Sequence, residues 1–314
     1  MTEIAKNLLE RYPIRKTGKQ KTEFIEFVRA FAEARGFSCS VEKGAFGVRN
    51  IVVGDPDAAK VVFGAHYDTC AVLPFPNFIT PKHFGIYLLY QILLVVGMFA
   101  VVGAVSGIAH GIALLAGTQL SFDAGYWIAY LTFLLLFFLM MAGPANKHTV
   151  NDNSSGVITL LELMDRTSPD GTAAFVFFDL EEAGLLGSAA FASKHKAAMK
   201  NKLLINFDCV SDGEHVIFAL RPKAKDKADL LGACYPSAEA VQCEVLTKGV
   251  FYPSDQVNFA RGVGVAALKR GKLGILYMDR IHTKHDTVYD EKNIAYLTEG
   301  AVRLVRNLSE KATE

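Results

Sequence analysis

A histidine and several carboxylates directly follow three largely apolar runs of this chain. The runs, with the residues that follow them, are 61–65 with His66 and Asp68, 173–180 with Glu181 and Glu182, and 203–207 with Asp208. A buried carboxylate without a partner costs much free energy, so such groups must be solvated, paired or bound to metal. Imidazole and carboxylate groups both ligate zinc, and the pattern therefore favours a metal site.

Two further stretches add ligand candidates to this set. Asp152 lies among Asn and Ser residues, and His282 lies three residues before a second histidine, His285. Taken singly, Asp152 could belong to a loop that caps a helix, and His66 with Asp68 could be a surface pair. Taken together, these residues supply ligands for two metal ions that share one carboxylate.

Spacing within two motifs indicates how the chemistry could be divided. His66 and Asp68 face the same side of an extended strand, so the carboxylate can accept the second N–H of the imidazole and orient it. Adjacent carboxylates diverge on a strand, so one of Glu181 and Glu182 can bind metal while the other transfers protons. The ordinary alternative for the Glu pair is an exposed acidic turn beside a helix N-terminus.

The apolar patterns around these motifs predict alternating strands and helices. We expect strands at 38–41, 50–53, 61–65, 173–180, 203–210, 215–220, 264–268 and 273–278. We expect helices at 17–36, 154–164, 185–195 and 291–308. This order is typical of an α/β fold with a mixed, largely parallel central sheet flanked by helices. Such sheets build their sites where parallel strands end.

Between His66 and Asp152 the chain holds two apolar runs, at 86–105 and 124–142, and no Lys or Arg from residue 84 to residue 146. Each run matches the ~20 residues that cross the hydrocarbon core of a bilayer. We therefore predict a single catalytic domain, an inserted transmembrane hairpin and a lipid bilayer as partner. The predicted bounds are 1–82 with 147–314 for the domain, 83–146 for the hairpin, and about 86–107 and 124–142 for its spans.

Charge beside the spans predicts an orientation. Lys82 and Lys147 flank the insertion on the domain side, whereas residues 106–123 between the spans contain no Lys or Arg. The positive-inside rule then places the domain in the cytoplasm. The charged N-terminal segment lacks the pattern of a secretory signal. We expect an integral membrane protein with a cytoplasmic catalytic domain.

Small residues recur within the hairpin. Gly103, Gly107 and Gly111 are four residues apart, which predicts that the first helix continues past residue 105 with one flat face. Such faces let helices approach closely in lipid, either the second span of the same chain or another copy in a homo-oligomer. Ser121 and Asp123 before the second span resemble a helix N-cap.

Composition narrows the partners and the redox state. The formal net charge of +1, without blocks of like charge, offers no electrostatic basis for binding nucleic acid. The five cysteines are scattered and form no C-x-x-C pair, so we expect reduced thiols rather than a disulfide framework.

Five short stretches occur in order around the insertion: GAHYDT at 64–69, NDNSSG at 151–156, DLEEAGLLGS at 179–188, NFD at 206–208 and IHTKHDT at 281–287. They resemble the motifs of the M28 family of zinc exopeptidases, which includes di-zinc aminopeptidases and the related glutaminyl cyclases. The resemblance covers nearly all of the chain outside the hairpin. It implies two zinc ions and hydrolysis of peptide bonds.

The resemblance also implies a role for each candidate. The implied ligand set is Asp152 bridging both ions, His66 with Asp208 on one ion, and Glu182 with His282 on the other. Glu181 would be the general base that takes a proton from the attacking water and delivers it to the leaving amine. His285 competes with His282 as a ligand, but the family pattern places the ligand four residues before the Asp-Thr step and selects His282. Asp286, like Asp68, would support the site.

One stretch departs from the family pattern. Ser254-Asp255-Gln256 lies where many relatives have Ser-Asp-His, in a loop that shapes the substrate pocket. We expect Asp255, Tyr252 and Phe251 to contact substrate, whereas Phe259 with these aromatic residues could equally form core.

The sequence thus predicts a membrane-anchored di-zinc exopeptidase, foremost an aminopeptidase, that hydrolyses peptides near the membrane surface. Two alternatives stay open. One is a glutaminyl cyclase or other non-peptide amidohydrolase, which resembles a one-metal form of this site, although the intact His66 and Asp208 favour the hydrolase. The other is a catalytically silent membrane scaffold, although such a protein has no need of Glu181.

Overall fold

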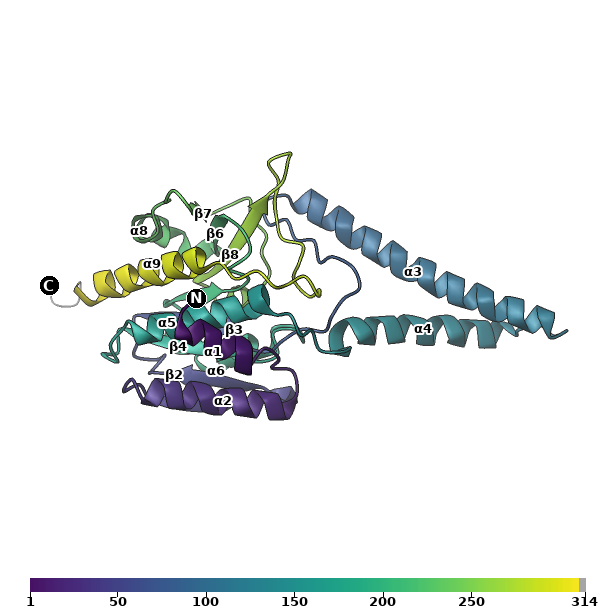
Figure 1. The fold of residues 1–314 in the computed structure, drawn as a ribbon, viewed down its shortest axis with the longest axis horizontal. Coiled ribbons are helices and arrows are strands. Elements are labelled where there is room, and N and C mark those ends of the chain that lie inside the picture. Colours follow the sequence, from purple (N-terminus) through teal and green to yellow (C-terminus); the bar gives the residue numbers. More distant parts are fainter. Residues whose placement is uncertain (311–314) are drawn as a thin grey trace.

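The computed structural model describes residues 1–310, in which nine strands form one sheet (Figure 1). The strands are β1 (Cys39–Lys43), β2 (Arg49–Val53), β3 (Val61–His66), β4 (Ala173–Phe178), β5 (Leu203–Phe207), β6 (His215–Leu220), β7 (Gln242–Leu246), β8 (Gly262–Arg270) and β9 (Leu276–Tyr277). The α-helices are α1 (Glu3–Arg11), α2 (Gly18–Glu33), α3 (Phe84–Leu115), α4 (Phe122–Ala142), α5 (Ser155–Asp165), α6 (Leu186–Lys194), α7 (Lys196–Met199), α8 (Ala228–Cys234) and α9 (Glu291–Glu310).

The order of strands in the sheet is β1-β2-β4-β3-β5-β8-β6-β7, with β9 paired to β8. The four central strands β4, β3, β5 and β8 are parallel to one another, whereas β1, β2, β6 and β9 add antiparallel pairings at the sides. The predicted mixed α/β sheet flanked by helices is therefore confirmed. Its parallel strands lie at the centre, where their carboxyl ends meet at one edge.

Alternating side chains of the central strands build an apolar layer on each face of the sheet. In β4, Phe175 and Phe177 belong to the core beneath α1, α2, α5, α8 and α9, whereas Val176 and Phe178 belong to the core beneath α6. Strand side chains point to opposite faces with a period of two residues, so a strand that is apolar throughout must be covered on both. The continuous apolar runs of the sequence therefore mark the central strands.

A buried ion pair holds the end of β4 where it approaches the polar edge of the sheet. Lys21 of α2 lies with its Nζ 2.5 Å from Oδ1 of Asp179, and both side chains are buried. Asp179 Oδ2 also accepts a hydrogen bond from the backbone N–H of Arg49, at 2.9 Å. A buried carboxylate is tolerated only with such partners, so these contacts fix the chain just before Glu181.

Helices α3 and α4 project together from one side of the domain and approach each other toward the turn that connects them (Figure 1). Both are long and apolar enough to cross a membrane. Helix α3 begins two residues before the predicted span and continues eight residues beyond it, so its 32 residues extend about 48 Å. Ser121 caps α4 as predicted, because its side chain accepts a hydrogen bond from the N–H of Ala124.

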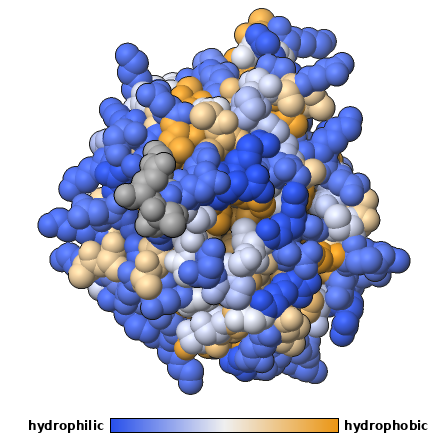
Figure 2. Space-filling model, turned by 90° about the vertical axis from the view of Figure 1, so that its left-hand side faces the viewer, coloured by the Kyte–Doolittle hydropathy of each residue, from blue (hydrophilic) through white to orange (hydrophobic). Residues whose placement is uncertain are grey.

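Exposed apolar side chains are concentrated on this hairpin. Of the large apolar residues exposed in the described part of the chain, all but Met1, Phe46, Phe251 and Leu273 lie between residues 84 and 141. Figure 2 shows the face turned away from the hairpin, on which hydrophilic side chains dominate. Contiguous exposed apolar surface of this extent is typical of contact with a membrane or another protein.

The glycine face of α3 is not covered by α4. A Cβ added at Gly103, Gly107 or Gly111 would meet no other atom within 4 Å. The two helices instead contact through other side chains, such as Phe99 and Phe133, whose ring centroids are 5.9 Å apart. Of the two alternatives for this face, packing against the second span is therefore wrong, and the homo-oligomer stays a prediction.

The hairpin is joined to the domain at both of its ends. The N–H of Val72 donates to the carbonyl of Pro144 at 2.9 Å, which brings together the segments that lead into α3 and out of α4. On the other side, Phe251 contacts the rings of Phe84 and Tyr87, with centroids 5.1 Å and 5.7 Å away. The first two turns of α3 therefore pack on the domain rather than standing clear of it.

Candidate metal centre

The predicted ligands come from five chain segments that meet at the carboxyl edge of the central strands. His66 ends β3, Glu182 follows β4, and Asp208 follows β5. Asp152 lies in the segment Val150–Ser154 immediately before α5, where its own backbone is not helical (φ −112°, ψ 96°), and His282 lies in the loop between β9 and α9. Since β3, β4 and β5 are parallel neighbours, their carboxyl ends converge, and the two loops complete the cluster.

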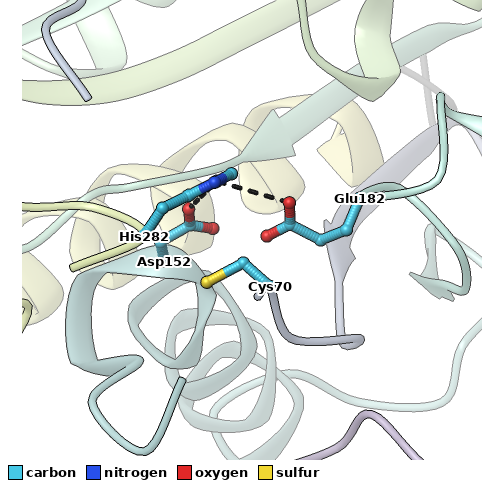
Figure 3. A group of neighbouring side chains, drawn as sticks. All are labelled: Cys70, Asp152, Glu182 and His282. Atoms are coloured by element: carbon cyan, nitrogen blue, oxygen red, sulfur yellow. Dashed lines mark ion pairs between the residues drawn. The ribbon is translucent and has the colours of Figure 1, made fainter. Parts of the chain in front are cut away.

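Asp152 stands between the two histidines. Its Oδ1 lies 3.2 Å from Nε2 of His66, and its Oδ2 lies 2.9 Å from Nε2 of His282. The same His66 nitrogen is 3.5 Å from Oδ1 of Asp208, and the same His282 nitrogen is 3.3 Å from Oε2 of Glu182. Figure 3 shows the contacts of His282 with Asp152 and Glu182. The five side chains therefore form two groups that share one carboxylate.

These separations fit zinc ligands. Two donor atoms about 2.1 Å from one tetrahedral zinc ion lie roughly 3.4 Å from each other. The atoms of His66, Asp152 and Asp208 that could ligate an ion all lie within 4.8 Å of one another, as do those of Asp152, Glu182 and His282. Oε1 of Glu182 is buried and has no hydrogen-bond partner among the described residues, which leaves it available to a cation.

Cys70 lies beside the second group, although the sequence predicted only a reduced thiol there. Its Sγ lies within 4.8 Å of the possible ligand atoms of Asp152, Glu182 and His282 (Figure 3). Burial raises the pKa of this thiol well above its usual value, and the nearby carboxylates of Glu182 and Asp152 raise it further. A protonated thiol is a weak ligand, so the protonated Cys70 forms part of the wall of the site rather than a ligand.

The electrostatics of the second group follow from excess acid in a buried site. Burial raises the pKa of Glu182 to about 8. Burial alone would lower the pKa of His282, but Glu182 and Asp152 outweigh it and raise that pKa to about 9. The carboxylates thus favour positive charge at this position, which a metal ion would supply in place of the imidazolium proton.

Glu181 lies beside both ligand groups but is not the carboxylate that they share, which is Asp152. Its possible ligand atom is within 4.8 Å of those of His66 and Glu182, and its side chain lines the cavity described below. Burial raises its pKa well above the usual glutamate value, only partly opposed by His66. A raised carboxyl pKa brings proton exchange nearer to neutral pH, as a general base requires.

Two further aspartates hold the ligands in place. Asp68 accepts backbone hydrogen bonds from Glu181 at 3.0 Å and Glu182 at 3.3 Å, and its Oδ1 is 3.5 Å from Nδ1 of His66. Asp286 accepts the N–H of Asp152 at 2.9 Å. These contacts are those expected of groups that orient metal ligands.

The loop around Asp152 also caps α5, so a helix-capping role of this motif is compatible with a metal-binding role. Oδ1 of Asn153 accepts the N–H of Gly156 at 3.0 Å and that of Cys209 at 3.2 Å. Asn153 therefore ties the start of α5 to the end of β5, while the neighbouring Asp152 side chain faces the histidines.

Left-handed backbone conformations occur directly at the ligands. Leu180, Cys209 and His282 have φ values of 53°, 56° and 59°, which side chains other than glycine seldom adopt. Each costs about 1 kcal/mol or more and persists only where the surroundings enforce it. Two of these residues lie beside Glu181 and Asp208, and the third is His282. The fold therefore enforces an unfavourable backbone conformation where it orients the side chains of the site.

A cavity of about 240 Å³ opens onto the cluster. The proposed ligands and Glu181 line it, together with Tyr252, whose hydroxyl donates to the carbonyl of Asp208 at 3.0 Å. Of the other two predicted substrate contacts, neither lines this cavity: Phe251 packs on α3, and Asp255 is fully buried, which raises its pKa to about 7. Phe259 is buried against Phe178 and belongs to the core.

Two side chains of α3 that were not among the predicted site residues line the same cavity. They are Tyr87 and Gln91 in the first two turns of the helix. Gln91 is the strongly polar exception in the first apolar run. A polar residue in a predicted span is a possible signal of a site, but its direction depends on how the helix docks.

Several solved structures share this fold. LapA, an aminopeptidase of Legionella pneumophila, has a TM-score of 0.58 at 13% identity, over 98% of this chain and 70% of that one. A glutaminyl cyclase of Porphyromonas gingivalis has a TM-score of 0.58 at 16% identity, over 97% of each chain. A Zn-dependent exopeptidase of Parabacteroides distasonis has a TM-score of 0.60 at 13% identity, over 97% of this chain and 96% of that one. At these identities the likeness shows the fold.

No curated protein sequence matches this chain. The model of peptidase family M28 matches residues 139–304, more than half of the chain, and this match includes Asp152, Glu182, Asp208 and His282. The zinc-dependent fold of this family implies zinc at the cluster. The family match and the shared fold together show that the chain belongs to peptidase family M28.

Proposed function

We propose that the protein is a membrane-anchored di-zinc exopeptidase, foremost an aminopeptidase, that hydrolyses peptide bonds close to the membrane surface. The observation that carries the proposal is the position of Asp152, whose two carboxylate oxygens face His66 and His282 separately, at 3.2 Å and 2.9 Å. A carboxylate with one oxygen toward each group is suited to bridge two ions. The proposed ligand set is Asp152 shared, His66 with Asp208, and Glu182 with His282.

Zinc at this centre would polarise the scissile carbonyl and lower the pKa of bound water toward ~7. The side chains of the chain itself then complete the reaction. Glu181 accepts a proton from the attacking water and returns it to the leaving amine, which its partly buried position beside His66 and its raised pKa support. Asp68 fixes the backbone of Glu181 and Glu182, so the base keeps its direction while it exchanges the proton.

A glutaminyl cyclase is the second candidate, because several of the similar structures are such enzymes. Cyclisation uses the substrate's own amine as nucleophile and needs no hydrolytic water. The present site instead assembles a second group from His66 and Asp208 beside the shared Asp152. This second group favours a hydrolase, and together with Glu181 it also argues against a silent scaffold.

A peptide library separates these functions. We expect the purified, zinc-loaded protein to remove single residues from free N-termini, detected by mass spectrometry as a loss of one residue mass at that end. Libraries with acetylated N-termini serve as the control and should stay intact. Loss of ammonia from N-terminal glutamine without chain shortening would assign cyclase activity, and shortening from the carboxyl end would overturn the aminopeptidase assignment.

Membrane anchoring is supported by the exposed apolar hairpin and by cations at its base. Lys16 donates to the carbonyl of Met141 at the end of α4, at 3.5 Å, while Lys82 precedes α3 and Lys147 follows α4. Cationic residues on this side and a connecting turn without Lys or Arg fit a cytoplasmic catalytic domain. The open glycine face of α3 is consistent with a homo-oligomer within the bilayer.

Cysteine labelling tests the orientation. A cysteine in place of Gln119, in the turn between α3 and α4, should react with a membrane-impermeant maleimide added to intact cells. A cysteine in place of Lys147 should react only after the cells are opened, because this position lies on the domain side. The wild-type chain supplies the background from its five cysteines. Labelling of position 147 but not 119 in intact cells would reverse the assigned orientation.

A further inference from the structure

A second cavity lies between the two helices of the hairpin, at the end next to the domain. Its volume is about 630 Å³. The walls come from α3, α4 and the chain segments that join the hairpin to the domain, and all of them are apolar. The lining residues include Leu94, Gly97 and Met98 of α3, Leu136 and Met140 of α4, and Phe75.

This interhelical cavity and the cavity at the metal centre share two walls. One is α3, because Tyr87 and Gln91 line the metal cavity while Leu94 and Met98 line the interhelical cavity. These four residues recur at helical spacing, so they occupy one face of α3. The other shared wall is the segment before α3, which contributes Asn77 and Ile79 to the metal cavity and residues 72–75 to the interhelical cavity.

The polarity of this shared face changes once along its length. Gln91 and Tyr87 offer hydrogen-bonding groups beside the metal centre, whereas the positions that follow offer only hydrocarbon and the thioether of Met98. The rise from Gln91 to Met98 is about 10 Å, which an extended peptide covers in about three residues. A molecule lying along this face would therefore need a polar end at the metals and an apolar chain beyond it.

We infer that the interhelical cavity binds the apolar portion of the substrate whose scissile amide lies at the metal centre. Resting on the proposed peptidase function, this assigns the substrate class: peptides with an apolar segment a few residues after the free N-terminus. Figure 1 shows α3 and α4 separated at the domain and closer at their connection, and the cavity is lined by both helices and by residues 72–75 next to the domain. Burial of apolar side chains there would add binding energy that a short polar peptide lacks.

The test compares two substrates with the same N-terminal residue. One is a short soluble dipeptide, and the other continues into a run of leucines and alanines. We use the full chain in phosphatidylcholine bilayers and measure the ratio of kcat/KM for the long substrate to that for the dipeptide. Gly97→Phe should lower this ratio by about tenfold or more, since one misfitting methylene in an apolar pocket can already change specificity by roughly 10- to 200-fold.

Val96→Phe is the matched control. It adds the same aromatic group one residue away, where Val96 is 57% exposed and does not line the cavity. An added Cβ at Gly97 meets no other atom within 4 Å, and Gly97 lines the cavity, so the side chain of the test variant begins in open space there. Because the long substrate partitions into the bilayer equally for both variants, only occupation of the cavity distinguishes them.

The outcomes separate this inference from the proposed function. Cleavage of the dipeptide with an equal ratio in wild type, Gly97→Phe and Val96→Phe would overturn the binding site while leaving the peptidase intact. An unchanged ratio accompanied by loss of co-purifying phospholipid in Gly97→Phe would assign the cavity to lipid and overturn it as well. Failure of the wild type to cleave either peptide would refute the peptidase and with it this inference.

Discussion

Replacing Glu181 with glutamine is expected to lower kcat/KM by about 10²- to 10⁴-fold while the protein keeps its zinc. Glutamine has nearly the same shape but cannot accept the proton of the attacking water. The side chain of Glu181 lies next to His66 and Glu182, whereas the carboxylate that the two ligand groups share is that of Asp152. The measurement is kcat/KM for a peptide with a free N-terminus, together with zinc content by mass spectrometry.

Glu182→Gln is the matched control, since it makes the same chemical change at the next residue. Oε2 of Glu182 lies 3.3 Å from Nε2 of His282, so this variant should lose zinc as well as activity. Unchanged activity in Glu181→Gln would remove this residue from the reaction. Loss of zinc from both variants would instead make Glu181 a ligand.

Zinc content is expected to fall in steps when the ligands are removed one at a time. The wild type should carry about two zinc ions per chain, and either His66→Ala or His282→Ala should reduce this to about one. Asp152→Ala should reduce zinc below either histidine variant, because its oxygens face both groups. Equilibrium dialysis followed by metal analysis measures the three values on folded protein.

His285→Ala controls for a general effect of removing a histidine from this loop. His285 belongs to none of the candidate ligand groups, and its variant should keep both ions. A wild-type content of one zinc, unaffected by His66→Ala, would show a mononuclear site and favour the cyclase alternative. This experiment therefore decides the number of ions independently of any activity assay.

The elements that hold the ligands were predictable because burial and polarity change abruptly there. Strands β3, β4 and β5 are largely apolar. His66 is the last residue of β3, Asp208 directly follows β5, and Glu181 comes three residues after the end of β4, so the sequence marks both the strands and the polar groups at their ends. By contrast, β7 was not predicted. Its residues Gln242–Leu246 are only partly buried, and a strand of this kind at the edge of a sheet carries no strong apolar pattern.

The walls of the cavity were less predictable than the ligands. Tyr87 and Gln91 lie in a run whose composition indicates only a membrane span, and nothing in that pattern shows that two turns dock on the domain. Cys70 was similarly hidden, because its place beside Asp152 depends on the contact between residues 72 and 144. In each case the missing information is a tertiary contact between distant segments, which local periodicity does not contain.

The hydrogen bond between Val72 and Pro144 joins the two ends of the hairpin beside the metal centre, and this restricts the order in which the protein can assemble. His66 and Asp152 lie on opposite sides of the hairpin in sequence, so the centre that they share closes a loop containing both α3 and α4. Loop-closure entropy grows only slowly with length, so this long loop adds little thermodynamic burden. In the proposed membrane-anchored protein the geometric condition is stricter, because Asp152 can reach His66 only after the chain has entered the bilayer and returned. Binding of both metal ions would thus be the last step of assembly and would stabilise only a chain whose hairpin is correctly inserted.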